Sequence, residues 1–203
     1  MTLLFSDSAA SKARRIVFTG GPGAGKTTIA FRLAAERPEQ FVAVPEAATQ
    51  VYRALQSRWD RLDDAGRRDA QRRIYRLQLE QEQFYADAAA GRTLLLDRGS
   101  VDGSAYWPDG ADDYWHALGT SRELELKRYD RVIWMESCAA VGEYDGDASN
   151  SCRHESANDA ITTGERLARV WAPHPHFHRI VAYPSLEQKF AAVTALIQSA
   201  IPQ

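Results

Sequence analysis

The sequence predicts an α/β fold in which helices flank a five-stranded parallel sheet. Five short apolar runs, near residues 16, 41, 93, 131 and 179, alternate with stretches of helical period. This alternation is typical of parallel strands joined by right-handed helical crossovers. A glycine-rich segment directly follows the first run. No repeat or linker is visible, so residues 14–203 are expected to form one domain after a flexible tail at residues 1–13.

The first apolar run leads into the most informative motif of the chain. Ile16-Val17-Phe18 is predicted to be a buried strand, and the helix predicted from Thr28 to Glu36 follows the motif Gly20-x4-Gly25-Lys26-Thr27. This is the pattern of a phosphate-binding loop (P-loop), as found in P-loop NTPases. Glycines let consecutive N–H groups turn towards phosphate oxygens, the lysine adds a point charge, and the threonine hydroxyl is a hard ligand for Mg²⁺.

We therefore predict that this loop binds a nucleotide, with Thr27 as a ligand for Mg²⁺. A glycine-rich turn that matches by chance is the alternative, but it does not explain the strand before the motif and the helix after it. The predicted nucleotide contacts are Gly21, Pro22, Gly23, Ala24, Gly25, Lys26, Thr27 and Thr28.

Composition and charge restrict the class of protein further. The chain has 203 residues, of which 44% are hydrophobic and 26% charged, as is usual for a globular domain. A net charge of −2 gives no signal for nucleic acid or a membrane surface. Cys138 and Cys152 are too few for a disulfide framework, so reduced thiols in the cytoplasm are expected. Neither a signal peptide nor a membrane span is predicted, and a homo-oligomer is left open.

Glu46 is the first candidate for binding a second substrate. It follows the predicted strand Phe41–Val44 and precedes a predicted helix from Ala47 to Gln56. Ligands of open parallel sheets collect at the carboxyl ends of strands, so Glu46 is predicted to bind or activate a phosphate acceptor. The alternative is an ordinary acidic residue at a helix N-terminus, favoured by the helix dipole.

A long helix is predicted from Asp64 to Ala90, with apolar residues such as Ile74 and Leu77 on one face. Arginines and aspartates are interleaved before and within its first half, and an ion-paired, solvated face is the simpler interpretation. Contact of one or two arginines with substrate phosphate is the alternative. The arginines concerned are Arg58, Arg61, Arg67, Arg68, Arg72, Arg73 and Arg76.

The third predicted strand, Thr93 to Asp97, ends in an acid as a Walker B strand does. Asp97 is expected either to hold Mg²⁺ through water or to accept the proton of an acceptor hydroxyl. Arg98 is predicted to clamp phosphate, with a structural ion pair as the alternative. The next stretch, residues 100–119, carries Asp102 and a set of aromatic residues that either line an acceptor pocket or pack a small helical subdomain. These aromatic residues are Tyr106, Trp107, Tyr114 and Trp115.

The stretch from Ser137 to Asn158 has no hydrophobic period and follows the predicted strand Arg131–Met135. A loop this long is usually functional or disordered, so we predict a mobile lid at about residues 137–158 that delivers Arg153 on closure. A disordered insertion is the alternative. The predicted catalytic residues are thus Lys26, Asp97, Arg98 and Arg153.

The C-terminal part is predicted to add a helix, a strand and a last helix. The helix runs from Asp159 to Trp171 with Thr162 or Thr163 as a cap, and the strand covers residues 180–183. Ser185 is predicted to cap the last helix. Between them stand His174, His176 and His178, for which a surface turn is preferred over a metal site because no carboxylate or cysteine joins them nearby.

In order, RIVFTGGPGAGKTT, VAVPEAATQVYR, TLLLDRGSVDGSAYW, NSCRHE and RIVAYPSLEQKF resemble the pattern of the small AAA-type P-loop proteins. That group is related to the ribosylnicotinamide kinase domain and, more distantly, to nucleoside and nucleoside-monophosphate kinases. The resemblance covers about residues 14–198. It implies a kinase-type sheet with a lid, ATP and Mg²⁺ as cofactors, and acceptor-side carboxylates at Glu46 and Asp97. Residues 172–177 depart from the pattern, and no appended helical domain or arginine finger of a ring-forming motor is visible.

Three functions fit the sequence. The first is a small-molecule kinase that moves the ATP γ-phosphoryl to a hydroxyl of a nucleoside-like acceptor. The second is a regulatory module that binds or hydrolyses ATP without such an acceptor. Nucleic-acid processing is the third, and the near-neutral charge argues against it. The predicted acceptor contacts are Glu46, Asp102, Tyr106 and Trp107, and the predicted Mg²⁺ ligands are Thr27 and Asp97.

Overall fold

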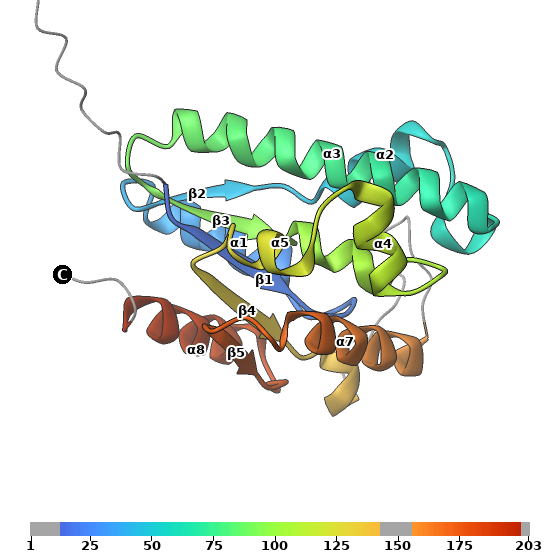
Figure 1. Ribbon diagram of the computed structural model, residues 1–203. Coiled ribbons are helices and arrows are strands. Elements are labelled where there is room, and N and C mark those ends of the chain that lie inside the picture. Colours follow the sequence, from blue (N-terminus) through green and yellow to red (C-terminus); the bar gives the residue numbers. More distant parts are fainter. Residues whose placement is uncertain (1–12, 143–155, 200–203) are drawn as a thin grey trace, which may run out of the picture.

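The computed structural model describes residues 13–142 and 156–199, and a five-stranded parallel sheet lies at its centre (Figure 1). The strand order is β2-β3-β1-β4-β5, so the strand that precedes the P-loop occupies the middle. Every neighbouring pair is parallel, which confirms the predicted sheet. The strands are β1 (Arg15–Thr19), β2 (Phe41–Val44), β3 (Thr93–Asp97), β4 (Arg131–Met135) and β5 (Phe177–Ile180).

Helices cover both faces of the sheet (Figure 1). The α-helices are α1 (Lys26–Glu36), α2 (Ala47–Ala54), α3 (Asp64–Ala88), α4 (Ala111–Leu118), α5 (Arg122–Leu126), α7 (Ala157–Trp171) and α8 (Leu186–Gln198). The described residues also form the short 3₁₀ turns η1 (Trp59–Arg61), η2 (Ser100–Ala105) and η3 (Cys138–Val141). No helix in the described part of the chain is long and apolar enough to cross a membrane.

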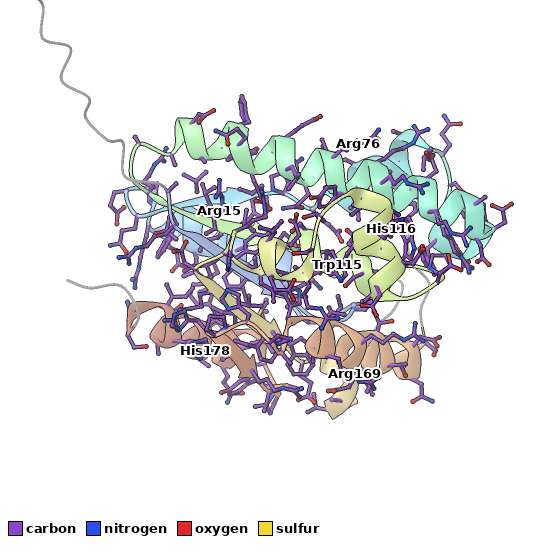
Figure 2. The ribbon with its side chains drawn as sticks, in the orientation of Figure 1. Arg15, Arg76, Trp115, His116, Arg169 and His178 are labelled. Atoms are coloured by element: carbon purple, nitrogen blue, oxygen red, sulfur yellow. The ribbon has the colours of Figure 1, made fainter. Side chains whose placement is uncertain are left out.

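The alternation of side chains along the strands divides the core into two layers. In β1, Ile16 and Phe18 pack with residues of α1 and α8, whereas Val17 faces the opposite side. On that opposite side, aromatic residues of α4 and α7, Trp115 and Trp171 among them, fill the core (Figure 2). Because both faces are covered, the middle residues of the central strands are all apolar, which is why the sequence predicted these strands well.

The predicted fifth strand was wrong in its position. β5 covers residues 177–180 rather than 180–183, and Phe177 pairs with Val132 while Ile180 pairs with Met135. Val181, predicted inside the strand, is 58% exposed. β5 is an edge strand with histidine and arginine in its middle, so it lacks the continuous apolar run that marks a buried strand.

The histidines of this region have structural contacts. His174 is buried, its Nε2 lies 3.0 Å from the carbonyl oxygen of Tyr129, and its Nδ1 accepts the N–H of His176 at 3.1 Å. His178 lies within β5, where its Nε2 is 2.7 Å from Arg131 Nη1. The prediction of a surface turn is therefore wrong for His174, which is part of the core next to Trp171.

Helix α7 begins earlier than predicted. Ser156 is its N-cap and forms a capping box with Asp159, so Thr162 and Thr163 lie inside the helix and do not cap it. Ser185 caps α8 as predicted, accepting the Gln188 N–H at 3.2 Å. Within the predicted lid, η3 lies near its beginning and α7 begins at its end, and the lid itself stays a prediction. Asn150, Arg153 and Glu155 lie outside the described residues.

Candidate functional site

The P-loop connects β1 to α1, as predicted, and two of its glycines have no room for a side chain. A Cβ on Gly20 would lie 2.1 Å from the carbonyl oxygen of Met135, and one on Gly21 would lie 2.2 Å from that of Ala160. Gly25 is the N-cap of α1 with φ 82°. The N-terminus of an eleven-residue helix therefore meets the loop, an arrangement that favours bound anions.

Lys26 and Thr27 begin α1 and reach in two directions. Lys26 is buried, and its Nζ donates to the carbonyl oxygen of Gly21 at 2.9 Å, folding the ammonium over the loop. The Thr27 hydroxyl donates to Asp97 Oδ2 at the end of β3. This contact joins the P-loop to the predicted Walker B acid, so the two motifs form one site.

Asp97 is almost completely buried, and its second carboxylate oxygen, Oδ1, has no hydrogen-bond partner among the described residues. Burial raises the pKa of Asp97, and the nearby Glu46 carboxylate raises it further. A buried anionic oxygen without a donor suits a cation. A threonine hydroxyl and a carboxylate are the hard oxygen ligands that Mg²⁺ prefers, so Thr27 and Asp97 fit this ion.

The Arg98 guanidinium is ion-paired with two carboxylates. Its Nε donates to Glu46 Oε1 at 2.5 Å and its Nη1 to Asp102 Oδ2 at 2.9 Å. The backbone of Arg98 has φ 80°, an unusual conformation for a residue with a side chain. Gln78 stabilises this conformation by donating from Nε2 to the Arg98 carbonyl oxygen at 3.3 Å. Arg98 is thus ion-paired in this structure, its role as a phosphate clamp stays a prediction, and its Nη2 is buried without a partner among the described residues.

Asp102 receives donors from three elements. Thr19 Oγ1 lies 3.0 and 3.1 Å from its two oxygens, and Trp171 Nε1 donates to Oδ1 at 2.6 Å. Together with Arg98 these donors surround both carboxylate oxygens. Asp102 lines the cavity described next, but its contacts fit a residue that orients Arg98 better than one that binds an acceptor directly.

A cavity with five aromatic side chains in its wall, called the aromatic cavity below, lies beside this cluster, between α2, α3 and η2. Arg98 and Asp102 form part of its wall, and Gln71 and Gln78 of α3 contribute two amides. Gln78 donates to Glu82 Oε1 at 3.1 Å as well as to Arg98, whereas the Gln71 side chain, 3% exposed, makes no hydrogen bond with the described residues. The aromatic lining residues are Tyr52, Trp59, Tyr75, Tyr106 and Tyr114.

Tyr106 and Trp107, both predicted to contact the acceptor, lie in different surroundings. Tyr106 lines the cavity, with its ring centroid 5.7 Å from that of Trp59. Trp107 does not line it, and its predicted contact with the acceptor stays a prediction. Its ring packs in the core against Tyr114 at 5.4 Å, and its Nε1 donates to Asp113 at 2.6 Å. A gain of buried aromatic area in the α4 region explains this placement.

Several arginines before and within the first half of α3 are ion-paired, as the simpler interpretation predicts. Arg73 binds Asp69 at 2.7 Å, Arg67 contacts Asp64 at 3.4 Å, and Arg68 pairs with Asp109. Arg76 is exposed on the same helix (Figure 2). None of these arginines lines the aromatic cavity in the described part of the chain.

Sequence reasoning missed the cavity residues on α2, η1 and α3. The available signal was Gln71 and Gln78, two amides seven positions apart that share the buried face of α3 with Ala70. Buried amides on a helix face are often there for a specific partner, because burial of an amide without one is unfavourable.

The parallel sheet and the P-loop between β1 and α1 define the fold of a P-loop NTPase. The chain belongs to the AAA domain family, to which residues 15–189 match. No curated protein matches the sequence. Solved structures of similar fold include NadR in complex with NAD and AMP-PNP, with a TM-score of 0.62 and 16% identity over 94% of this chain and 51% of that one.

Two further structures show the same fold. NadR in complex with NR has a TM-score of 0.65 and 17% identity, covering 92% of this chain and 49% of that one. The deoxyadenosine kinase from M. mycoides with bound dATP has a TM-score of 0.62 and 13% identity, covering 91% of this chain and 99% of that one. The chain thus spans about half the length of the NadR chains and nearly all of the kinase.

Proposed function

We propose that this protein is an ATP-dependent kinase that transfers the γ-phosphoryl group to a hydroxyl of a nucleoside-like acceptor. One observation carries this proposal. Arg98 and Asp102 form part of the wall of the aromatic cavity, and Arg98 directly follows Asp97, which contacts Thr27 of the P-loop. A site for an organic molecule therefore adjoins the site for phosphate. A module that only hydrolyses ATP needs the phosphate site and has no use for the cavity.

The lining of the cavity suggests the chemical class of the acceptor. Five aromatic side chains suit a planar ring, which gains from edge and face contacts with them. The Gln71 amide offers both a donor and an acceptor to a heteroaromatic edge. A nucleobase, or a pyridine carboxamide of the kind carried by NR, presents such an edge on a flat ring. The ribose hydroxyls of either would then extend towards Glu46 and Arg98.

The chain's own residues support phosphoryl transfer in the following way. The P-loop binds the ATP phosphates, and Thr27 and Asp97 would hold Mg²⁺, which neutralises phosphate charge when bound. Glu46 is the carboxylate that we assign to the acceptor hydroxyl, because it is ion-paired with Arg98 of the cavity wall and its side chain is 12% exposed. As the hydroxyl oxygen bonds to the γ-phosphorus, the bond to the bridging oxygen of ADP breaks and the hydroxyl proton passes to the Glu46 carboxylate.

The decisive experiment measures ADP release from ATP in the presence of single candidate acceptors, namely nucleosides, deoxynucleosides, ribosylnicotinamide and the matching monophosphates. We expect one or more hydroxyl-bearing nucleosides to stimulate ADP release and to yield a phosphorylated product by mass spectrometry. ATP hydrolysis that is indifferent to every acceptor would instead favour the regulatory ATPase.

A further inference from the structure

The P-loop is gripped from its carbonyl side by residues outside the motif. Ser137 Oγ donates to the carbonyl oxygen of Pro22 at 2.6 Å, and the Cys138 N–H donates to that of Gly23 at 3.2 Å. Lys189 Nζ, from α8, lies 3.3 Å from the carbonyl oxygen of Ala24. Three consecutive loop carbonyls are therefore each bound by a donor, two from the segment after β4 and one from the last helix.

These carbonyls belong to the peptide units whose N–H groups are those of Gly23, Ala24 and Gly25. All described peptide bonds are trans, so C=O and N–H of one unit point in opposite directions. A donor that holds the oxygen on one side therefore aims the N–H to the other side. The N–H groups of these three residues make no hydrogen bond with the described part of the chain, which leaves them for a ligand.

The position of Lys189 makes its charge energetically unfavourable. The side chain is 4% exposed, lies beside the apolar Phe190 and Val193 layer, and also donates to the carbonyl oxygen of Glu136 at 2.7 Å. A buried ammonium is costly compared with a leucine or methionine of similar size. The position of the Lys189 ammonium near the Ala24 carbonyl oxygen offers a benefit in return for this cost. A cation at the oxygen end of a peptide unit strengthens the N–H at the other end, here that of Gly25, as a donor.

We propose that Ser137 and Lys189 are positioning residues that hold the N–H groups of residues 23–25 in the phosphate-binding orientation before nucleotide arrives. This inference rests on the proposed nucleotide site and extends it to two residues outside the P-loop motif. It also gives a role to the first residues of the segment that the sequence alone assigned to a lid.

The test compares Ser137→Ala and Lys189→Met with Thr194→Val, a control on α8 whose hydroxyl bonds only within its helix, to the Phe190 carbonyl oxygen. Calorimetry measures the Kd of ATP and of inorganic tripolyphosphate, which carries the phosphates alone. We expect each positioning variant to weaken both ligands about tenfold and by the same factor, with Ser137→Thr and Lys189→Arg recovering most of the loss. A loss for ATP without a loss for tripolyphosphate would overturn the inference, since the effect would then lie at the adenosine.

Lys26→Ala separates this inference from the proposed function. If Lys26→Ala abolishes ATP binding while Ser137→Ala and Lys189→Met bind like Thr194→Val, the positioning role is wrong and the nucleotide site stands. If Lys26→Ala binds ATP normally, the nucleotide site itself is wrong. Should Lys189→Met fail to fold, Ser137→Ala decides alone, because it removes one neutral donor and leaves the buried charge in place.

Discussion

Gln71→Leu is expected to stabilise the free protein and to weaken acceptor binding at the same time. The Gln71 side chain is 3% exposed in the cavity wall and makes no hydrogen bond with the described residues, so the folded state bears part of the cost of desolvating an unpaired amide. Such a cost is about 1–3 kcal/mol for a neutral group. Leucine of similar volume removes it, and we expect about 1 kcal/mol more stability, or a rise in Tm of about 2–4 °C for a chain of this length.

The loss of acceptor affinity follows from the same amide. If it hydrogen-bonds the acceptor ring, its removal leaves a ring donor or acceptor unpaired, which costs about 1.4 kcal/mol or more and weakens binding about tenfold or more. Thermal unfolding of the free protein and titration of the acceptor identified by ADP release measure the two effects. ATP affinity serves as the internal control and should not change.

Gln78→Leu is the matched control, because it stands seven positions away on the same helix face but donates to both Glu82 and the Arg98 carbonyl oxygen. Its replacement leaves those acceptors short of a donor, so we expect a loss of about 1–3 kcal/mol in stability, opposite in sign to Gln71→Leu. The reasoning is refuted if the two variants shift Tm in the same direction, or if Gln71→Leu binds the acceptor as tightly as the unaltered protein.

Four other predictions follow from the site and the core. Lys26→Ala should abolish ATP binding by calorimetry without lowering Tm, and unchanged affinity would remove the nucleotide site. Asp97→Asn should keep ATP affinity within about tenfold but lower turnover about 10²-fold or more; near-normal turnover would make Asp97 structural. Glu46→Gln should raise the acceptor KM or lower kcat while ATP affinity stays intact. A rate of ADP release that is the same in this variant as in the unaltered protein would favour the regulatory ATPase. Burial lowers the pKa of His174 below 6.5, so just below that pH the unfolded state binds more protons than the folded state. The stability from His174 is therefore complete above about pH 6.5 and falls as the pH drops below it. Urea unfolding at several pH values should show this slope, and His174→Asn should lose it.

The parts of the fold that sequence predicted well are those set by local pattern. Leu94, Leu95 and Leu96 form a continuous apolar run because β3 is covered on both faces, and such runs identify central parallel strands. The P-loop was equally clear, since its glycines and lysine stand at fixed spacing. β5 was displaced by three residues because an edge strand with His178 and Arg179 in its middle carries no such run.

The parts of the site that could not be predicted depend on contacts between distant segments. Arg98 pairs with Glu46, 52 residues earlier, and Asp102 bonds Trp171, 69 residues later. Trp107 and Tyr106 are neighbours in sequence, yet one packs in the core and the other lines the cavity. Adjacent aromatic residues have the same local pattern, so only the packing of α3 and α4 against them decides which one faces a ligand.

The crowding around the glycines has a consequence for how this chain tolerates paired substitutions. A methyl group on Gly103 would meet the Tyr114 hydroxyl at 2.3 Å, and one on Gly99 would meet the Trp171 ring at 2.9 Å; in both cases a smaller partner side chain could restore the space. At Gly20 and Gly21 the obstacle is a backbone carbonyl oxygen of Met135 and Ala160, which every amino acid carries. Second-site suppressors should therefore arise for alanine at position 99 or 103, and random mutagenesis should yield none for alanine at position 20 or 21.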